Sequence, residues 1–356
     1  MARRQIGITV TKLRRRTKST PNWKSSNRPI PADQLVHETD LELPEFVLVW
    51  QALVVDLIRE LAVREALFLH LEQLVAESRD GTLGYQETAR FHFGDETIAI
   101  RQIQGRGIHK PASLNAALSI TTTYTKPGQK PPYEDLQGAD GYARYKYQGE
   151  DPNHSSNRAL RACLEFQLPL AYFIGVAQGV YLVEFPVYLI AEDPQRHEFT
   201  LSFDRSEAHF DPSLLTSTER RYALRQTKAR IHQPVFRQRV LRAYQTTCAV
   251  CRLKHVELLD AAHIISDSKP NGDPIIPNGI ALCKIHHAAY DRNLLGIRPN
   301  YQVEINADLL LEIDGPMLKH GLQEMNGQKL LVPPSVQSRP DPERLQVRYE
   351  EFKNAS

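Results

Sequence analysis

The chain lacks the sequence features of a membrane protein, a secreted protein or a disulfide framework. None of its apolar runs reaches the roughly eighteen residues that a membrane span requires, because even residues 46–71 are interrupted by charged side chains. The first residues contain no apolar signal-peptide core. Four cysteines are too few for a disulfide framework in 356 residues, which favours a reducing compartment. We therefore expect a cytoplasmic protein.

A large excess of charge is lacking too, but the charge that is present is unevenly distributed. The formal net charge is +2, and 41% hydrophobic residues are enough for the cores of two or three domains. Residues 1–30 nevertheless contain nine Lys and Arg and no acid, and residues 219–254 contain ten Lys and Arg with one acid. The second stretch leads into a segment rich in Cys and His, which suggests a polyanionic partner.

The periodicity of apolar residues predicts a mixed α+β protein in six parts. These are a basic flexible arm (1–40), a helical segment (41–83), a curved sheet or small barrel (84–205), a basic helical connector (206–243), a Cys/His module (244–330) and a tail with a helix (331–356). The strands predicted within the sheet are 89–93, 97–103, 118–124, 142–147 and 181–190, with a helix near 157–166 and a possible last strand in 193–203.

The Cys/His module contains two sets of candidate metal ligands. Two short chelate pairs about thirty residues apart have the spacing of a structural zinc site, and they consist of Cys248, Cys251, Cys283 and His286. A purely structural site does not need the second set, which consists of His263, Asn278, His287 and Asp291. His287 and Asp291 are four residues apart in a predicted helix, 282–293, so both can address one ion. Asp291 could equally be a solvated helix residue.

In the order strand, loop, strand, helix, residues 244–299 resemble the HNH nuclease family, a ββα-metal fold. The resemblance rests on His263, Asn278 and His287, with the zinc pairs placed around them. It implies hydrolysis of DNA with His263 as the general base, Asn278 as the brace of the hairpin and His287 as a ligand of a catalytic Mg²⁺ or Mn²⁺. Many members place an Asp or His directly before the base, where this chain has Ala262. Asp260 and Asp291 are the substitute ligands to test, although Asp260 could instead orient an imidazole or lie in a turn.

The middle part, over about residues 101–190, resembles the SRA domain, also called YDG. The resemblance is carried by runs such as Gly107-Ile-His-Lys-Pro, Tyr145-Lys-Tyr147-Gln-Gly149 and Phe185-Pro-Val. It implies a curved SRA/PUA-like barrel that extrudes a modified cytosine from duplex DNA. The implied pocket residues are Tyr133 or Tyr147 to stack on the base, Asp135 or Asp140 to read its edge, and Arg106, His109 and Lys110 to reach phosphates or fill the gap. The alternative is that they are ordinary turn and core residues.

Together the two resemblances predict a modification-dependent DNA endonuclease of the restriction type. Its partner would be double-stranded DNA, and its ions a structural Zn²⁺ and a catalytic Mg²⁺ or Mn²⁺. Because one HNH site cuts one strand, a double-strand break would need a homodimer or two visits. Two alternatives stay open: a DNA-binding or regulatory protein with a structural zinc fold and no cleavage, and an HNH nuclease that reads unmodified or phosphorothioate DNA.

Overall fold

The computed structural model describes residues 45–102, 107–125, 140–205 and 216–355. The chain divides into two compact units, Met1–Gln51 and Ala52–Ser356. In the described ranges, no helix combines the length and the apolar character that crossing a membrane requires. The predicted basic arm lies outside the described residues, as do Arg106, Tyr133 and Asp135.

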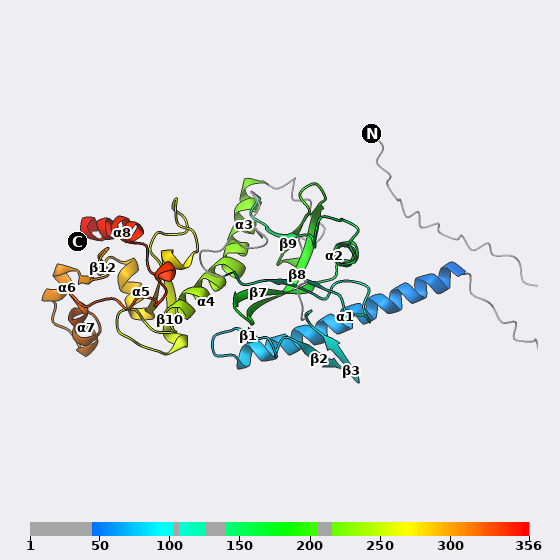
Figure 1. Ribbon diagram of the computed structural model, residues 1–356, viewed down its shortest axis with the longest axis horizontal. Coiled ribbons are helices and arrows are strands. Elements are labelled where there is room, and N and C mark those ends of the chain that lie inside the picture. The colour runs from blue at the N-terminus through cyan, green and yellow to red at the C-terminus, as the bar shows by residue number, and fades with distance from the viewer. Residues whose placement is uncertain (1–44, 103–106, 126–139, 206–215, 356) are drawn as a thin grey trace, which may run out of the picture. The chain divides into compact units, whose positions relative to one another are not determined.

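The architecture is mixed α+β, and its largest element is a seven-stranded sheet (Figure 1). The strand order is β4-β5-β7-β8-β9-β6, with β1 paired to β8. Only the β5–β7 pair is parallel among these pairs. The bounds are β1 (Leu83–Gly84), β4 (Ile108–His109), β5 (Ser119–Thr122), β6 (Ala143–Lys146), β7 (Leu170–Ala177), β8 (Val180–Asp193) and β9 (Glu198–Ser202), and a separate hairpin consists of β2 (Arg90–Phe93) and β3 (Glu96–Ala99).

The sheet curls into a half-barrel because the long strand β8 takes part in both of its halves. Strand β8 pairs with β7 along its first residues and with β9 along its last, and both ladders contain a register shift. The curl brings β6 across from β5, so that the Tyr145 hydroxyl donates to the carbonyl oxygen of Thr121 at 3.0 Å. In the described residues β4 and β6 do not pair. The expected barrel is therefore open.

One long helix, α1 (Glu45–Glu77), lies within the predicted helical segment. Its residues Val63, Leu67 and Leu71 are fully buried in the core of the middle part. A buried ion pair between Glu60 and Arg64 fixes it further, because Arg64 also donates to the backbone carbonyls of Ala117 (2.7 Å) and Pro169 (2.8 Å). Helix α2 (Ser155–Phe166) lies where a helix was predicted, with Cys163 in the core.

The connector is a continuous helical path. It consists of α3 (Ser217–Thr227), a π-helix η4 (Lys228–His232) and α4 (Gln233–Ala243). Pro234 is the second residue of α4 and follows η4 directly, so its missing N–H falls where the helix changes from the π to the α pattern. The path therefore continues through a π-turn, and π-turns are frequent at functional sites.

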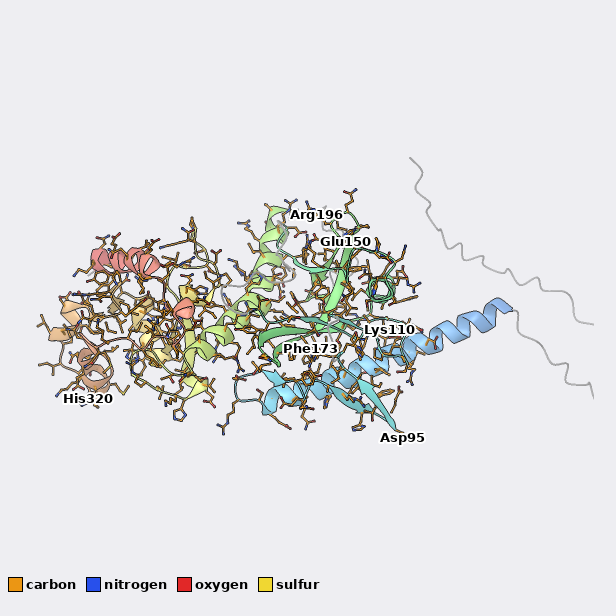
Figure 2. The ribbon with its side chains drawn as sticks, viewed as in Figure 1. Asp95, Lys110, Glu150, Phe173, Arg196 and His320 are labelled. Atoms are coloured by element: carbon orange, nitrogen blue, oxygen red, sulfur yellow. The ribbon has the colours of Figure 1, made fainter. Side chains whose placement is uncertain are left out.

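The remaining elements build a second core that includes the Cys/His segment. Its central part is a hairpin, β10 and β11, followed by helix α5. The bounds are η5 (Val256–Leu258), β10 (Leu259–His263), η6 (Ile276–Asn278), β11 (Gly279–Cys283), α5 (Lys284–Asp291), β12 (Leu295–Ile297), β13 (Val303–Ile305), α6 (Ala307–Leu311), α7 (Pro316–Gly321), η7 (Gln323–Met325), η8 (Val336–Ser338) and α8 (Pro342–Ala355). Figure 2 shows the side chains on this scaffold.

Candidate metal centre and active site

The β10–β11 hairpin separates the two candidate ligand sets. Strands β10 and β11 are antiparallel, with Leu259 opposite Cys283 at one end and His263 opposite Gly279 at the other. Helix α5 begins directly after Cys283. The structure therefore has the strand, loop, strand, helix order that the sequence predicted, with the cysteine cluster at one end of the hairpin and His263 at the opposite end.

The cysteine cluster has the geometry of a tetrahedral metal site. One ligand atom from each of Cys248, Cys251, Cys283 and His286 lies within 4.8 Å of all the others. The Cys251 and Cys283 sulfurs are 3.9 Å apart, and the Cys248 sulfur is 3.6 Å from Nδ1 of His286. Zinc–sulfur bonds of about 2.3 Å in a tetrahedron place ligand atoms about 3.8 Å apart. The four side chains therefore fit a zinc ion.

Local backbone and side-chain contacts prepare this cluster for an ion. The Cys248 amide donates to the carbonyl oxygen of Leu253 at 2.8 Å and closes a tight turn around the first cysteine pair. His286 donates from Nε2 to the Gly321 carbonyl at 2.7 Å, which leaves Nδ1 facing the sulfurs. Hydrogen bonds with Cys251 and Cys283 lower the pKa of the Cys248 thiol, and the contact with Cys248 raises that of Cys251. A cation in the cluster would stabilise both thiolates together.

His263 is clamped by helix α4 at the other end of the hairpin. Its ring stacks on Phe236, with the ring centroids 4.0 Å apart and an interplanar angle of 18°. Gly279 makes room for this contact, because a Cβ atom there would lie 2.4 Å from Val240 and 2.8 Å from Phe236. Within the described residues, the buried Nε2 atom of His263 has no hydrogen-bond partner. The ring is thus held by packing, with one polar atom left for a ligand.

Asn278 braces the loop between the two strands. It is fully buried, and its Oδ1 accepts from the Ile265 amide at 2.9 Å. Its Nδ2 donates to the carbonyl oxygens of Ile265 (2.9 Å) and Asp273 (3.1 Å). These three bonds join both ends of the loop directly beside His263, which is the arrangement that the role expected for Asn278 requires.

Burial sets the protonation state of His263. Desolvation lowers the pKa of His263 below its ordinary 6.5, and the charge of Asp267 opposes this change only in part. The imidazole is therefore neutral at neutral pH. A neutral imidazole is the form that can accept a proton from water.

His287 lies between the two carboxylates that the sequence offered as ligands. Its Nε2 is 3.4 Å from Asp291 Oδ2, and its Nδ1 is 3.8 Å from Asp260 Oδ2. Asp260 also contacts Lys284 (2.8 Å) and Arg237 (3.6 Å). Burial raises the pKa of Asp260, but hydrogen bonds from Lys284 and the Ala261 amide outweigh burial and hold it below the usual range. Asp291, with a side chain 60% exposed, faces solvent.

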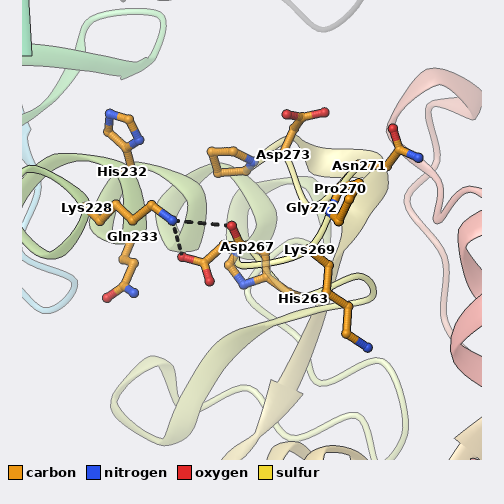
Figure 3. Close-up of a pocket in the computed structure, with 11 residues that line it drawn as sticks. Lys228, His232, Gln233, His263, Asp267, Lys269, Pro270, Asn271, Gly272 and Asp273 are labelled. Atoms are coloured by element: carbon orange, nitrogen blue, oxygen red, sulfur yellow. Dashed lines mark hydrogen bonds and ion pairs between the residues drawn. The ribbon is translucent and has the colours of Figure 1, made fainter. Parts of the chain in front are cut away.

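A cavity of about 440 Å³ opens beside His263 (Figure 3). Its lining includes Lys228 and His232 from η4 and Asp267 from the β10–β11 loop. Lys228 and Asp267 form an ion pair at 3.4 Å. These residues carry no signal in the sequence, because no motif spacing marks a lysine within a run of ten cations. Phe236 carries none either, because its partner His263 is 27 residues away in the chain.

Tyr147 and Asp140, two members of the expected base pocket, make contacts within the protein. Tyr147 is 3% exposed and its ring packs against His197 and Phe199. Burial and a hydrogen bond to Glu192 raise the pKa of Tyr147 to about 12. Tyr147 therefore has no exposed ring face on which a base could stack. Asp140 accepts from the Tyr142 amide at 3.2 Å and pairs with Arg144.

His109 and Lys110, from the same expected pocket, are also bound to backbone atoms. Nε2 of His109 lies 3.0 Å from the Ala99 carbonyl oxygen. The Lys110 ammonium donates to the Leu114 carbonyl at 2.7 Å. The four described members of the pocket thus have structural contacts, and the other three lie outside the described residues.

Comparison with known proteins identifies one domain of the chain. Two solved structures are similar at low identity: a modification-dependent restriction endonuclease, TagI (15% identity, 69% of this chain, 85% of that chain, TM-score 0.27), and a Type IV phosphorothioation-dependent restriction endonuclease, ScoMcrA (16%, 52%, 47%, TM-score 0.20). TM-scores this low establish no shared fold. No curated protein matches the chain. Residues 248–298 match a family described as HNH endonuclease, so the chain contains an HNH endonuclease domain.

Proposed function

We propose that this protein is a metal-dependent DNA endonuclease that hydrolyses phosphodiester bonds at His263. The observation that carries the proposal is the setting of this imidazole. It is stacked on Phe236, supported by the loop that Asn278 braces, kept neutral by burial and placed at a cavity. Burial also lowers the pKa of His109 and His232, so the stack on Phe236, the unpartnered Nε2 and the adjoining cavity are what set His263 apart.

In the proposed reaction His263 takes the proton of the attacking water. The water oxygen forms a bond to phosphorus while the bond from phosphorus to the 3′ oxygen breaks. Phe236 and Asn278 keep the imidazole in position during this transfer, since neither contact depends on substrate. When bound nearby, Mg²⁺ or Mn²⁺ supplies charge neutralisation at the phosphate and at the leaving oxygen.

We further propose that His287 and Asp291 hold the catalytic ion and that Asp260 orients His287. Lys284 and Arg237 already neutralise Asp260, whereas Asp291 contacts His287 and faces solvent. Nδ1 of His287 lies 3.8 Å from Asp260 Oδ2 and Nε2 lies 3.4 Å from Asp291 Oδ2, so an ion held by Nε2 would also be within reach of the Asp291 carboxylate. Asp291 then supplies the second metal ligand that many family members have at the position of Ala262.

The cysteine cluster is proposed to hold a structural zinc. All four ligands come from this chain and meet in a closed shell that leaves no position for substrate. Such an ion would contribute apparent binding free energy of about 10–16 kcal/mol to the folding of this module.

We also propose that cleavage depends on a modified base in the DNA. It is supported by the order of SRA-like motifs in residues 101–190 and by the curled sheet that these residues form. Because Tyr147 and Asp140 are engaged in the fold, Tyr133, Asp135 and Arg106, which lie outside the described residues, remain the pocket candidates that the SRA resemblance implies. The partner would be double-stranded DNA with a modified, flipped cytosine.

One cleavage assay tests both levels of the proposal. The protein is incubated with Mg²⁺ or Mn²⁺ and matched plasmids that carry cytosine, 5-methylcytosine or 5-hydroxymethylcytosine, beside His263→Ala. We expect cleavage of a modified plasmid by the parent and none by the variant. Equal cleavage of all three plasmids would refute the dependence on modification and leave the nuclease intact. Cleavage by His263→Ala at the parental rate would refute the role of His263 as the general base.

A matched pair of variants tests the assignment of the two carboxylates. Asp291→Asn should raise the Mg²⁺ concentration needed for half-maximal cleavage at least tenfold, because it removes a charged ligand. Asp260→Asn should lower the maximal rate and change the Mg²⁺ requirement less, because it acts through the orientation of His287. The opposite pattern would show that Asp260 binds the ion and that Asp291 orients His287.

A further inference from the structure

The cavity beside His263 has the size of a ligand site and lies on one side of the proposed base. Its volume of about 440 Å³ falls within the roughly 300–1,000 Å³ that is usual for small-molecule sites. One wall is the π-helix η4 with Lys228 and His232, and the other is the β10–β11 loop (Figure 3). A DNA strand that reaches His263 must place a nucleotide next to this hollow.

The loop wall is held in one shape by contacts from three directions. Asn278 donates to the Asp273 carbonyl at 3.1 Å, and the Lys269 ammonium pairs with Glu351 of α8 at 2.6 Å. Gly272 is required by the tight fold of the loop, because a Cβ there would lie 1.9 Å from the Ser266 carbonyl oxygen. The cavity is therefore formed before any ligand arrives, which lowers the cost of binding.

Lys228 supplies the charge on the opposite wall. Its ammonium lies 3.3 Å from the Asp267 carbonyl oxygen and 3.4 Å from the carboxylate Oδ2. Both distances are longer than the 2.7–2.9 Å of a strong charge-assisted bond. Both side chains are about one-third exposed, 31% for Lys228 and 33% for Asp267. A pair of this kind contributes little to stability, so Lys228 can exchange Asp267 for another anion.

We propose that this cavity binds one nucleotide of the cleaved DNA strand and that Lys228 binds its phosphate beside the scissile bond. The proposal rests on the nuclease function proposed for His263. An ammonium offers three donors, so Lys228 can contact two phosphate oxygens in place of its two contacts with Asp267. Asp267 then acts as a competing anion that keeps Lys228 in position when no DNA is bound.

The salt dependence of DNA binding tests the subsite without any need for cleavage. Affinity of the full-length protein for a labelled duplex is measured by fluorescence anisotropy without added Mg²⁺ or Mn²⁺, from 50 to 200 mM NaCl. The loss of one phosphate contact reduces the slope of log affinity against log salt by about 0.9. Over this range the parent should therefore lose about three to four times more affinity than Lys228→Ala.

Three further variants make the test specific. Lys228→Arg keeps the charge and should keep the parental slope. Asp267→Asn removes the competing anion and should tighten binding, a gain that a folding defect would not produce. Lys353→Ala is the matched control, because Lys353 also pairs with an acid at 3.4 Å, Glu304, but does not line the cavity. It should leave both affinity and slope unchanged.

The outcomes for the subsite and for the nuclease are separate. An unchanged slope in Lys228→Ala, with parental cleavage of plasmid, overturns the subsite and leaves the nuclease standing. A reduced slope in Lys228→Ala, together with a parent protein that cleaves none of the plasmids, supports phosphate binding and overturns the nuclease. Equal slope changes in Lys228→Ala and Lys353→Ala would also overturn the subsite, because they would reflect net charge alone.

Discussion

Replacing Asn278 by Ala should destabilise the hairpin and slow cleavage, because its side chain ties the ends of the β10–β11 loop beside a backbone bond from the Ile264 amide to the Asn278 carbonyl (2.9 Å). The change removes three hydrogen bonds, two with the Ile265 backbone and one with the Asp273 carbonyl. Each contributes about 1 kcal/mol, and the buried Ile265 amide and carbonyl lose partners that water cannot replace. We expect a loss of about 3–4 kcal/mol, a large part of the 5–15 kcal/mol that is typical of a domain.

Hydrogen exchange measures this loss at the site itself. A cost of 3–4 kcal/mol corresponds to exchange about two to three orders of magnitude faster at the Ile264 and Ile265 amides. Global unfolding is followed by circular dichroism, because the two tryptophans are Trp23 and Trp50, outside the unit that contains the hairpin. A misplaced His263 should also lower the turnover rate about 10²-fold in protein that is still folded.

Gln323→Ala is the control for this experiment. Its amide also joins two backbone carbonyls, those of Leu309 (2.9 Å) and Glu312 (2.8 Å), but in the C-terminal elements. It should cost stability without a change in the turnover rate. Exchange at Ile265 that stays within threefold of the parent would refute the bracing role of Asn278, and equal turnover losses in the two variants would refute its specific link to His263.

Three other changes have expected results. Because burial lowers the pKa of His263, the rate at saturating DNA and Mg²⁺ should fall on the acid side with a midpoint below pH 6.5, and a midpoint above 6.5 would contradict this base. Cys251→Ser should lower the bound zinc measured by metal analysis from about one per chain, whereas Cys163→Ser should not. Gly279→Ala should cost about 1–3 kcal/mol in urea unfolding because its Cβ overlaps two side chains of α4, whereas Gly315→Ala, with open space around it, should cost little.

The Cys/His segment was predictable because its information is local. A Cys-x2-Cys turn and a Cys-x2-His pair at a helix start each fix two ligands within one turn of chain, so that only the meeting of the two pairs depends on the fold. The brace formed by Asn278 followed from family resemblance. The stack of Phe236 on His263 did not, because helical periodicity shows that a residue is buried but not which ring it meets.

Strand β7, at the centre of the sheet, was missed for a physical reason. Residues 170–177 read LAYFIGVA, and seven of the eight are buried. A strand covered on both faces has no alternation of polar and apolar residues, so the test that found β6 and β8 fails there. Tyr147 shows a different limit of the sequence pattern. Alternation placed it in the predicted strand 142–147, but the pattern does not show that its hydroxyl donates a hydrogen bond to Glu192.

The basic connector shows why the number of cations in a stretch of sequence does not give the number of DNA contacts. The sequence offered ten cations between residues 219 and 254 as a path for the phosphate backbone. In the structure Arg237 donates to the Leu259 carbonyl of β10 at 2.9 Å, and Arg242 pairs with Asp80 at 3.1 Å. These arginines satisfy protein atoms on two sides of α4, so their release to phosphates would break the packing that holds Phe236 against His263.

The cations left for DNA therefore lie outside α4, on both sides of it. Arg220, Arg221 and Arg225 of α3 and Lys254 after α4 are exposed, and Lys228 lies at the cavity. Since each neutralised phosphate adds about 0.9 to the salt slope, ten contacts from this stretch would give about 9, and five would give between 4 and 5. The same helix α4 that reduces the number of DNA contacts positions the base, so the connector uses one part of its charge for binding and the other for the shape of the active site.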